Sequence, residues 1–574
     1  MLIRNFVKPF WAIIIVIIVL TFIQVIADLL LPNYMADIVD QGIAKGDVAM
    51  ILHTGGIMLI VAFIGIACAI VAGFFASRTA LGVGKNLRTT IFRHISQFSL
   101  SEFDQIGTSS LITRTTNDIQ QIQQTTFMLL RMMLRAPLMC LGGIIMAIQK
   151  DGNLSLLLLA FLPFIALLIY LIMAKAMPLF RKLQTKIDQL NLVLRENLVG
   201  IRIIRAFSRI GFEKKKFAAA NEDLTNTSIT ANRIMAILNP SMNLSMNLLT
   251  IAIVYFASFH IAESNLMIGD MMAFIQYATQ IFMALMMLTM LFVMLPRAFA
   301  SAERIREVFS LTADIADPTH SEKPNLKMRG AIQFDKVSFR FQHAENCAVH
   351  EVSFTANPGE TVAIIGGTGS GKSALLNLIP RYYDVESGTI EIDGVDIRQM
   401  KQHDLRNLIA LVPQKITLFT GSINENIRIG KQDATEEEII HACKIAQADE
   451  FIEVLPHKYH TQVAQGGTNF SGGQKQRLSI ARAVVRKPQI YLFDDSFSAL
   501  DFKTDAKVRK ALNAETKNAT VIIVAQRVTS IQNADKILVM DNGKIVGQGT
   551  HEELLKSNEV YKEIVASQLF NDEL

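Results

Sequence analysis

The first half of the chain carries six long runs of apolar residues separated by polar connections. Each run can cross the hydrocarbon core of a bilayer, which needs roughly 20 helical residues. The pattern predicts membrane helices over Trp11–Leu31, Ile57–Ala76, Met128–Ile148, Leu154–Ala174, Leu244–Ile261 and Ala273–Leu295. Arg4 and Lys8 precede the first run, as in a secretory signal. That run is too long for a signal and no Ala-x-Ala cleavage site follows it, so we interpret it as a retained membrane helix.

The connections between these helices alternate in charge. The connection after the first helix contains three aspartates and one lysine. The third-to-fourth and fifth-to-sixth connections are only a few residues long. The two long connections are rich in basic residues: Arg78, Lys85, Arg88, Arg93, Arg114, Lys175, Arg181, Lys182, Arg202, Arg205, Lys214, Lys215 and Lys216. Because lysine and arginine mark the cytoplasmic side of a membrane, we expect both long connections and both termini in the cytoplasm.

The patterning beyond the membrane runs divides the chain into domains. Apolar residues recur at helical spacing from Leu179 to Phe217, so the fourth and fifth helices should continue well past the bilayer. After residue 331 strand and helix patterns alternate, as in a soluble α/β domain. We therefore predict a membrane domain over 1–313, a proline-containing linker over 314–330 and an α/β domain over 331–574.

Composition agrees with a membrane protein. The chain has 574 residues, of which 51% are hydrophobic and only 19% charged, which excludes a simple cytosolic enzyme. The net charge of +5 arises beside the apolar runs and indicates membrane topology rather than nucleic-acid binding. Cys68, Cys140, Cys347 and Cys443 form no CxxC pair and no zinc spacing, so we interpret them as small hydrophobic residues in a reducing compartment.

One motif in the α/β half predicts phosphate binding. Gly366, Gly367, Thr368, Gly369, Ser370, Gly371, Lys372 and Ser373 fit the pattern G-x-x-x-x-G-K-[ST], between a strand-like run and a helical run. The glycines allow backbone N–H groups to surround a β-phosphate at the N-terminus of a helix. Lys372 neutralises phosphate charge, and the hydroxyl of Ser373 can coordinate Mg²⁺.

Two further motifs accompany this loop. The apolar run Ile490–Phe493 ends in Asp494 and Asp495, and Asp494 lies where a strand-end acid helps to hold Mg²⁺ through water. A second phosphate-ready helix start is formed by Ser471, Gly472, Gly473 and Gln474. One nucleotide needs only one phosphate cradle, so this second surface indicates a nucleotide held by another protomer.

In this order the motifs resemble those of ABC transporters, and the whole chain resembles a half-transporter of the multidrug exporter class. The resemblance implies the type IV exporter fold, with six transmembrane helices and a cytosolic α/β P-loop NTPase domain. It implies ATP and Mg²⁺ as cofactors. It assigns the Walker A loop to Gly366–Ser373, the ABC signature to Ser471–Gln474, the Walker B aspartate to Asp494 and the D-loop to Ser498–Asp501, with Asp501 among the nucleotide-binding residues.

The resemblance also implies roles outside these motifs. Gln414 corresponds to the Q-loop glutamine, which helps to hold Mg²⁺ and contributes to catalysis. Phe341 occupies the position of the aromatic residue that stacks on adenine. The segments Phe103–Asp118 and Glu196–Phe207 resemble the two cytoplasmic loops whose coupling helices dock on the ATPase domains.

Two catalytic positions depart from the family pattern. The residue after the Walker B aspartate is normally glutamate, the general base or water-positioning group, and here it is Asp495. Because aspartate is one methylene shorter, we expect its carboxylate to fall roughly 1–1.5 Å short of the attacking water, and a misplacement of about 1 Å can cost about 10²-fold in rate. Gln526 occupies the position of the H-loop histidine and cannot carry a charge.

Both departures are explained by one hypothesis. A heterodimer would pair the intact signature of this chain with the intact glutamate and histidine of a second ABC half-transporter, leaving this chain with a degenerate ATP site. The alternative is a slow homodimer that tolerates both substitutions.

Polar and methionine side chains in the last two membrane helices are candidates for a substrate cavity. Methionine adapts to many apolar shapes, and polar residues at membrane depth usually face a bundle interior. The candidates are Asn243, Asn247, Gln276, Gln280, Met283 and Met287. The alternative is ordinary helix packing or contact with lipid. Asp28, near the outer end of the first predicted helix, is either an outer gate or cation site, or only an interfacial carboxylate.

These expectations combine into one function. We predict a multi-pass protein of a bacterial cell membrane that uses ATP to export hydrophobic, cationic drugs. A lipid or peptide exporter of the same architecture is the main alternative, and an ATP-gated channel is a second one. An importer is disfavoured because importers usually place the membrane and ATPase parts in separate chains.

Overall fold

The computed structural model describes residues 6–262, 266–322, 329–342 and 344–572, with side chains omitted at 290–293 and 569–572. The chain forms two compact units. The helical unit comprises Met1–Ser96 and Ser109–Leu311, and the α/β unit comprises Gln97–Thr108 and Thr312–Leu574.

The helical unit is built from long helices. In chain order these are α2 (Trp11–Asp37), α3 (Val48–Ile95), α5 (Thr108–Thr113), α6 (Ile119–Met128), α7 (Leu134–Lys150), α8 (Gly152–Val199), α9 (Ile201–Ala206), α10 (Ile210–Ala262) and α11 (Ile268–Ser310). Short π-helical segments extend α2 to Ile43 and join α5, α6 and α7 into one continuous rod, at Arg114–Asp118 and Leu129–Met133.

Six of these stretches are long and apolar enough to span a membrane. Each contains one of the six predicted runs, so the prediction of six membrane helices is confirmed. The helices are longer than the apolar runs because polar residues continue them at both ends. The starts of α3 and α8 are fixed by aspartate caps, in which Asp47 accepts a hydrogen bond from the Met50 N–H and Asp151 accepts two from the Asn153 and Leu154 N–H groups.

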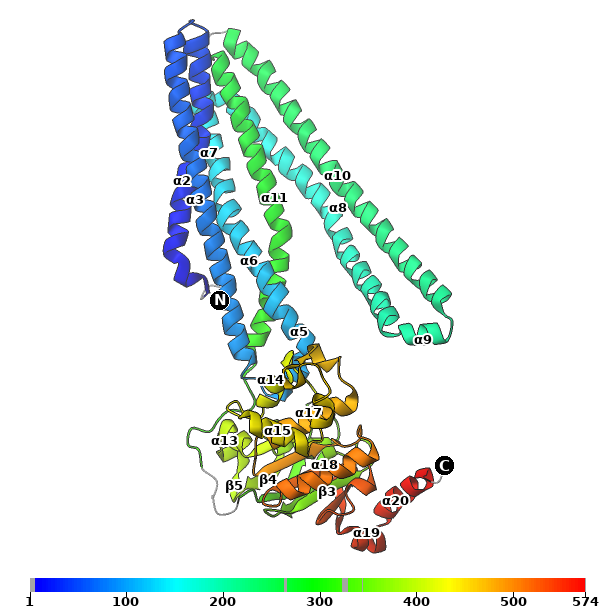
Figure 1. Ribbon diagram of the computed structural model, residues 1–574. Helices are drawn as coiled ribbons and strands as arrows, with labels where there is room; N and C mark the ends of the chain where they lie inside the picture. The colour runs from blue at the N-terminus through cyan, green and yellow to red at the C-terminus, as the bar shows by residue number, and fades with distance from the viewer. Residues whose placement is uncertain (1–5, 263–265, 323–328, 343, 573–574) are drawn as a thin grey trace. The chain divides into compact units, whose positions relative to one another are not determined.

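The helices of this unit form two groups (Figure 1). The first brings together α2, α3, α7 and α11. The buried cluster around Phe274 and Tyr277 of α11 takes side chains from α2 and α7, and also from α8 and α10. The second is the antiparallel pair α8 and α10, which diverges from the first group toward the end that carries α9. Within this unit, α8 and α10 therefore leave long flanks that no other helix covers.

The described part of the α/β unit contains two large sheets and a small one of two short strands, β7 (Gly421–Ser422) and β8 (Gln462–Val463). Strands β3 (Thr361–Gly366), β6 (Ile409–Val412), β9 (Ile490–Asp494), β10 (Thr520–Val524), β11 (Lys536–Asp541) and β12 (Lys544–Gly549) form a sheet of order β12-β11-β3-β10-β9-β6, parallel except for β12. An antiparallel sheet of order β2-β1-β4-β5 is built from β1 (Ile332–Phe339), β2 (Val349–Ala356), β4 (Ser387–Ile392) and β5 (Val395–Asp396).

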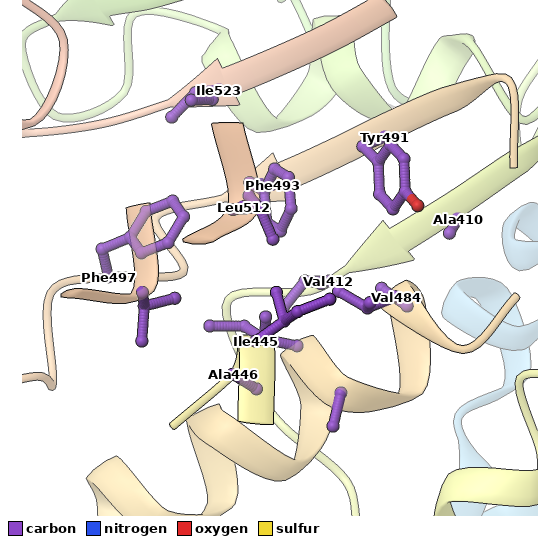
Figure 2. Packing of buried hydrophobic residues seen from close by; sticks show 14 of the residues in the cluster. Ala410, Val412, Ile445, Ala446, Val484, Tyr491, Phe493, Phe497, Leu512 and Ile523 are labelled. Atoms are coloured by element: carbon purple, nitrogen blue, oxygen red, sulfur yellow. The ribbon is translucent and has the colours of Figure 1, made fainter. Parts of the chain in front are cut away.

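Alternation along the central strand β9 separates two cores. Tyr491 and Phe493 point to one face, where Figure 2 shows them near Val412 of β6 and Val484 of helix α17 (Gly472–Val484). Leu492 points to the other face, which packs on helix α12 (Lys372–Leu378) and the antiparallel sheet. Because a parallel sheet buried on both faces needs apolar residues at consecutive positions, the run Ile490–Phe493 reads as an uninterrupted apolar strand.

A short segment from early in the chain belongs to the α/β unit. Helix α4 (Leu100–Ile106) is held there because Glu102 accepts a hydrogen bond from the Asp314 N–H at 3.0 Å and Tyr383 donates one to Asp104 at 2.9 Å. The sequence placed this segment in the membrane domain, whereas its contacts lie with the residues after Thr312. The predicted linker has no helix or strand in its described residues, and residues 323–328 lie outside them.

Candidate functional site

The loop from β3 to α12 has the shape of a phosphate cradle. Gly369 and Gly371 adopt φ angles of +83° and +95°, in the left-handed region that favours glycine. A Cβ atom at Gly371 would lie 2.1 Å from the carbonyl oxygen of Ala348. These glycines are therefore required by backbone geometry, and the loop ends at the N-terminus of α12, where N–H groups remain free to bind an anion.

Lys372 closes the cradle. It is 9% exposed, and its ammonium group donates to the carbonyl oxygens of Gly366 at 2.9 Å and Gly367 at 2.6 Å. Burial lowers the pKa of this ammonium group, whereas the neighbouring carboxylates of Asp494 and Asp495 raise it. A phosphate in the loop would replace two carbonyl contacts by a charged one, which is the stronger kind of hydrogen bond.

Ser373 and Asp494 bring a hydroxyl and a carboxylate together beside the loop. The Ser373 hydroxyl donates to the Asp494 carboxylate at 3.0 Å. Burial raises the pKa of Asp494, as does repulsion from Asp495, although the Ser373 hydrogen bond opposes the shift. Within the described residues no group of three His, Cys, Asp or Glu side chains could hold a metal alone. This donor set fits Mg²⁺, which takes one or two protein oxygens and completes its shell with phosphate and water.

The two positions that depart from the family pattern are in direct contact. The Gln526 side-chain amide donates to the Asp495 carboxylate at 3.0 Å, across the ends of the adjacent strands β9 and β10. Asp495 adopts a φ of +46°, a strained conformation for a residue with a side chain. Burial raises its pKa, while hydrogen bonds involving Ser498 and Gln414 lower it. Gln414, Asp495 and Gln526 are therefore gathered at one edge of the sheet.

The signature segment forms the start of helix α17. Ser471 caps it reciprocally with Gln474, because each side chain bonds the other residue's backbone N–H, at 3.3 and 2.9 Å. Gly473 approaches the D-loop closely, since a Cβ there would lie 3.1 Å from the Ala499 carbonyl oxygen. Asp501 caps helix α18 (Phe502–Glu515) by accepting from the Thr504 N–H, a bond that lowers its pKa.

An aromatic cluster carries Phe341. Its ring is 39% exposed and meets Phe339 and Tyr383 edge to face, with centroids 4.9 and 5.4 Å away. A cavity of about 280 Å³ beside this cluster is also lined by Asp104 and Asp314. Phe341 thus keeps an accessible ring surface, as an adenine-stacking residue requires.

Comparison with known proteins decides the family. The family model described as the ABC transporter transmembrane region matches residues 14–285, and the one described as ABC transporter matches residues 349–498. An uncharacterised ABC transporter ATP-binding protein of Mycobacterium tuberculosis is 43% identical over 570 residues, which is 99% of this chain and 98% of that protein. The chain belongs to the ABC transporter family.

Other relatives of this ABC transporter carry more specific names. A putative multidrug export ATP-binding/permease protein of Bacillus subtilis is 34% identical over 87% of this chain and 86% of its own length. A fatty acid ABC transporter ATP-binding/permease protein of Mycobacterium bovis is 33% identical over 83% of this chain and 75% of its own length. The solved structure of a bacterial Atm1-family ABC exporter with ATP bound matches with a TM-score of 0.81 and 26% identity, covering 97% of this chain and 98% of that one.

These matches confirm the predicted fold class, a six-helix membrane region followed by an ABC ATPase domain. ABC exporters couple ATP hydrolysis to transport and act as dimers. The transporter therefore works with a second half, whose identity the matches leave open.

In the helical unit of the transporter, Asp28 has partners on two other helices. Arg135 of α7 donates to its carboxylate at 3.0 Å, and Gln280 of α11 donates to its backbone carbonyl at 3.0 Å. α2 and its π-helical extension continue past Asp28 to Ile43, so at ~1.5 Å per residue roughly 20 Å of helix follows Asp28.

The predicted cavity residues are not gathered into one site within this chain. Asn243, Asn247, Gln276 and Met283 are exposed, whereas Met287 is half-buried against the α2, α7 and α11 core. Gln280 is used in the contact with α2 described above. The exposed candidates lie on α10 and α11, on surface that this single chain leaves uncovered.

Arg135, which pairs with Asp28, and Tyr383, which contacts Phe341 and Asp104, were not predicted from the sequence. A basic residue inside an apolar helix was a usable signal for Arg135, since charges at membrane depth are paired. Tyr383 follows the Walker A helix in a loop, and no local pattern marks it as a partner of both Phe341 and Asp104.

Proposed function

We propose that this chain is the half of a heterodimeric ABC exporter whose own ATP site binds nucleotide and hydrolyses it slowly. The observation that carries the proposal is the 3.0 Å hydrogen bond from Gln526 to Asp495. It ties the shortened carboxylate to an amide that is always neutral. Neither residue is then free to act as the usual base or as a charged γ-phosphate contact.

The binding machinery of the same site is complete in its residues. Lys372 occupies the cradle, and Ser373 and Asp494 lie together as ligands for Mg²⁺. Mg²⁺, when bound, would screen the phosphate charge. Such a site would hold nucleotide between this chain and the partner's signature. This chain's own Ser471–Gln474 would complete the faster site of the partner.

Native mass spectrometry of the complex, purified gently from its own host's membrane, tests the heterodimer. The expected result is a complex with a second ABC chain of different mass. A complex containing two copies of this chain alone would contradict the proposal, because Asp495 and Gln526 would then have to support turnover in both sites.

For the substrate we propose hydrophobic drugs, as in the relative named for multidrug export. A fatty-acid or lipid substrate is the second candidate, and the relative named for fatty acid transport supports it. The pairing of Asp28 with Arg135 weakens the expectation of a cationic substrate, since the carboxylate already has a cation at 3.0 Å. ATPase stimulation in lipid nanodiscs by drugs but not by fatty acids would favour the first candidate, and the reverse would favour the second.

We propose that Asp28 serves the gate through Arg135. The pair links α2 to α7, and Gln280 adds α11. Separating these helices would leave a guanidinium and a carboxylate unpaired at membrane depth, which is costly, so the pair favours one arrangement of the helices. This arrangement would have to break or shift when the exporter changes state.

A further inference from the structure

The C-terminal helix of the α/β unit holds the backbone around Gln526. Helix α20 (Glu559–Asp572) places Gln568 beside the loop that follows β10. The side-chain oxygen of Gln568 accepts from the Val528 N–H at 2.8 Å, and its amide nitrogen donates to the Gln526 carbonyl at 2.7 Å. One side chain thus fixes the main chain on both sides of Arg527.

Helix α20 is itself anchored. Tyr561 in its first turn is fully buried, and its hydroxyl lies 2.7 Å from Nδ1 of His551 on helix α19 (His551–Ser557). The N–H of Tyr561 donates to the Asn558 side chain at 2.8 Å. Gln568 lies two turns further along the same helix, so a fixed element presents its amide.

Packing between α20 and the loop is incomplete. A cavity of about 630 Å³ lies there, lined by Phe502, Gln526, Arg527, Leu555, Val565 and Gln568. The Arg527 guanidinium turns toward the Phe502 ring, at 5.4 Å from its centroid. Apolar residues of α20 and of this loop share one buried cluster, and among the described residues the two hydrogen bonds of Gln568 add a polar connection between helix and loop.

We propose that Gln568 is a positioning residue, which sets Gln526 against Asp495 and so prolongs the retention of nucleotide in this chain's ATP site. The inference rests on the proposed role of Gln526. The Gln526 amide reaches Asp495 at 3.0 Å, and a backbone displacement of about 1 Å would break that hydrogen bond. The C-terminal helix therefore tunes the site from outside the nucleotide-binding motifs.

The test measures how long this chain keeps nucleotide. The complex purified from its host membrane is loaded with Mg²⁺ and radiolabelled 8-azido-ATP, freed of unbound nucleotide, and photolysed after increasing delays, so that label on this chain reports retention. Gln568→Ala should shorten the retention time at least ~5-fold, with the initial affinity within about 2-fold. Gln568→Glu keeps the oxygen that accepts from the Val528 N–H but loses the N–H that donates to the Gln526 carbonyl. We therefore expect it to lower the logarithm of the retention time by about half as much as Gln568→Ala does.

Ser567→Ala is the matched control, because within the described residues the Ser567 hydroxyl donates to the Ile564 carbonyl oxygen of its own helix. It should retain nucleotide as the unmodified protein does. The proposal is overturned if Gln568→Ala also retains nucleotide normally, or if it weakens initial binding and retention equally, as a merely structural role would. Should Gln568→Ala unfold, normal retention in Gln568→Glu overturns it instead.

A Gln526→Ala variant separates this inference from the function on which it rests. If it retains nucleotide normally, the proposed role of Gln526 has failed. If it shortens retention while Gln568→Ala does not, only the positioning role of Gln568 has failed.

Discussion

The nucleotide-binding part and the hydrolytic part of the same ATP site differ in character. In the binding part, a glycine loop, a buried lysine and a hydroxyl–carboxylate pair keep the groups that phosphate and Mg²⁺ need. In the hydrolytic part, Asp495 and Gln526 are distant in sequence but lie in contact, and the Gln526 amide donates a hydrogen bond to the Asp495 carboxylate. Binding and turnover depend on separate residues, so a site can lose most of the second while it keeps the first.

Removing the lysine of the binding part should have the largest effect. Lys372→Ala deletes a charged contact to phosphate worth about 2–3 kcal/mol, or roughly 30- to 150-fold in ATP affinity. Fluorescent-nucleotide titration measures this directly. Lys510→Ala, on the exposed face of α18, is the control and should bind normally. Equal affinity in Lys372→Ala would contradict the assignment of Lys372 as a phosphate contact.

The hydrolytic part should recover only when both departures are reversed. Asp495→Glu with Gln526→His should raise hydrolysis at this site at least ~10-fold, since a roughly 1 Å displacement is corrected. Each single variant should give less than about 3-fold, because the two side chains are in contact and their effects do not add. Single-turnover ATPase measurements in a complex whose other site is inactivated test this. A fast site from Asp495→Glu alone would contradict the coupling.

The membrane ion pair offers a smaller effect that leaves nucleotide binding untouched. Asp28→Asn leaves Arg135 unpaired at membrane depth and should cost about 1–3 kcal/mol of stability in a partly exposed pair. We expect transport to fall several-fold while ATP affinity stays unchanged. Asp28→Asn with Arg135→Gln removes both charges and should recover the stability. Unchanged efflux and unchanged outward opening in Asp28→Asn would refute the gate.

The smallest effect concerns the buried carboxylate of Asp494. Burial raises the pKa of Asp494 in the folded protein, so ionised Asp494 lowers the free energy of unfolding near neutral pH. This penalty disappears as the pH falls through the folded-state pKa. Without nucleotide, Asp494→Asn should therefore raise the unfolding temperature near pH 7.5, by roughly 2–4 °C for each kcal/mol gained. The difference should shrink as the pH is lowered; a difference that grows as the pH falls would contradict the assignment.

Features carried by local pattern were predictable from the sequence. Six apolar runs gave six helices, and the spacing of Gly366, Gly371 and Lys372 gave the phosphate loop, because both depend on neighbours along the chain. The contact between Asp28 and Arg135 depends on the rotation of two long helices about their axes, which no single run determines. The bond between Gln526 and Asp495 depends on the adjacency of β9 and β10. The placement of α4 in the α/β unit depends on tertiary contacts alone.

The placement of α4 has a consequence for the order in which the protein is made. Its partners Asp314 and Tyr383 are encoded more than two hundred residues later, after the entire helical unit. At about 5–20 residues per second, the ribosome needs roughly 15 to 55 seconds to reach Tyr383 after finishing α4. During that interval Glu102 and Asp104 lack these contacts, so α4 exists in the nascent chain before the rest of the ATPase unit has been synthesised. All the membrane helices are therefore synthesised before the ATPase unit can be completed.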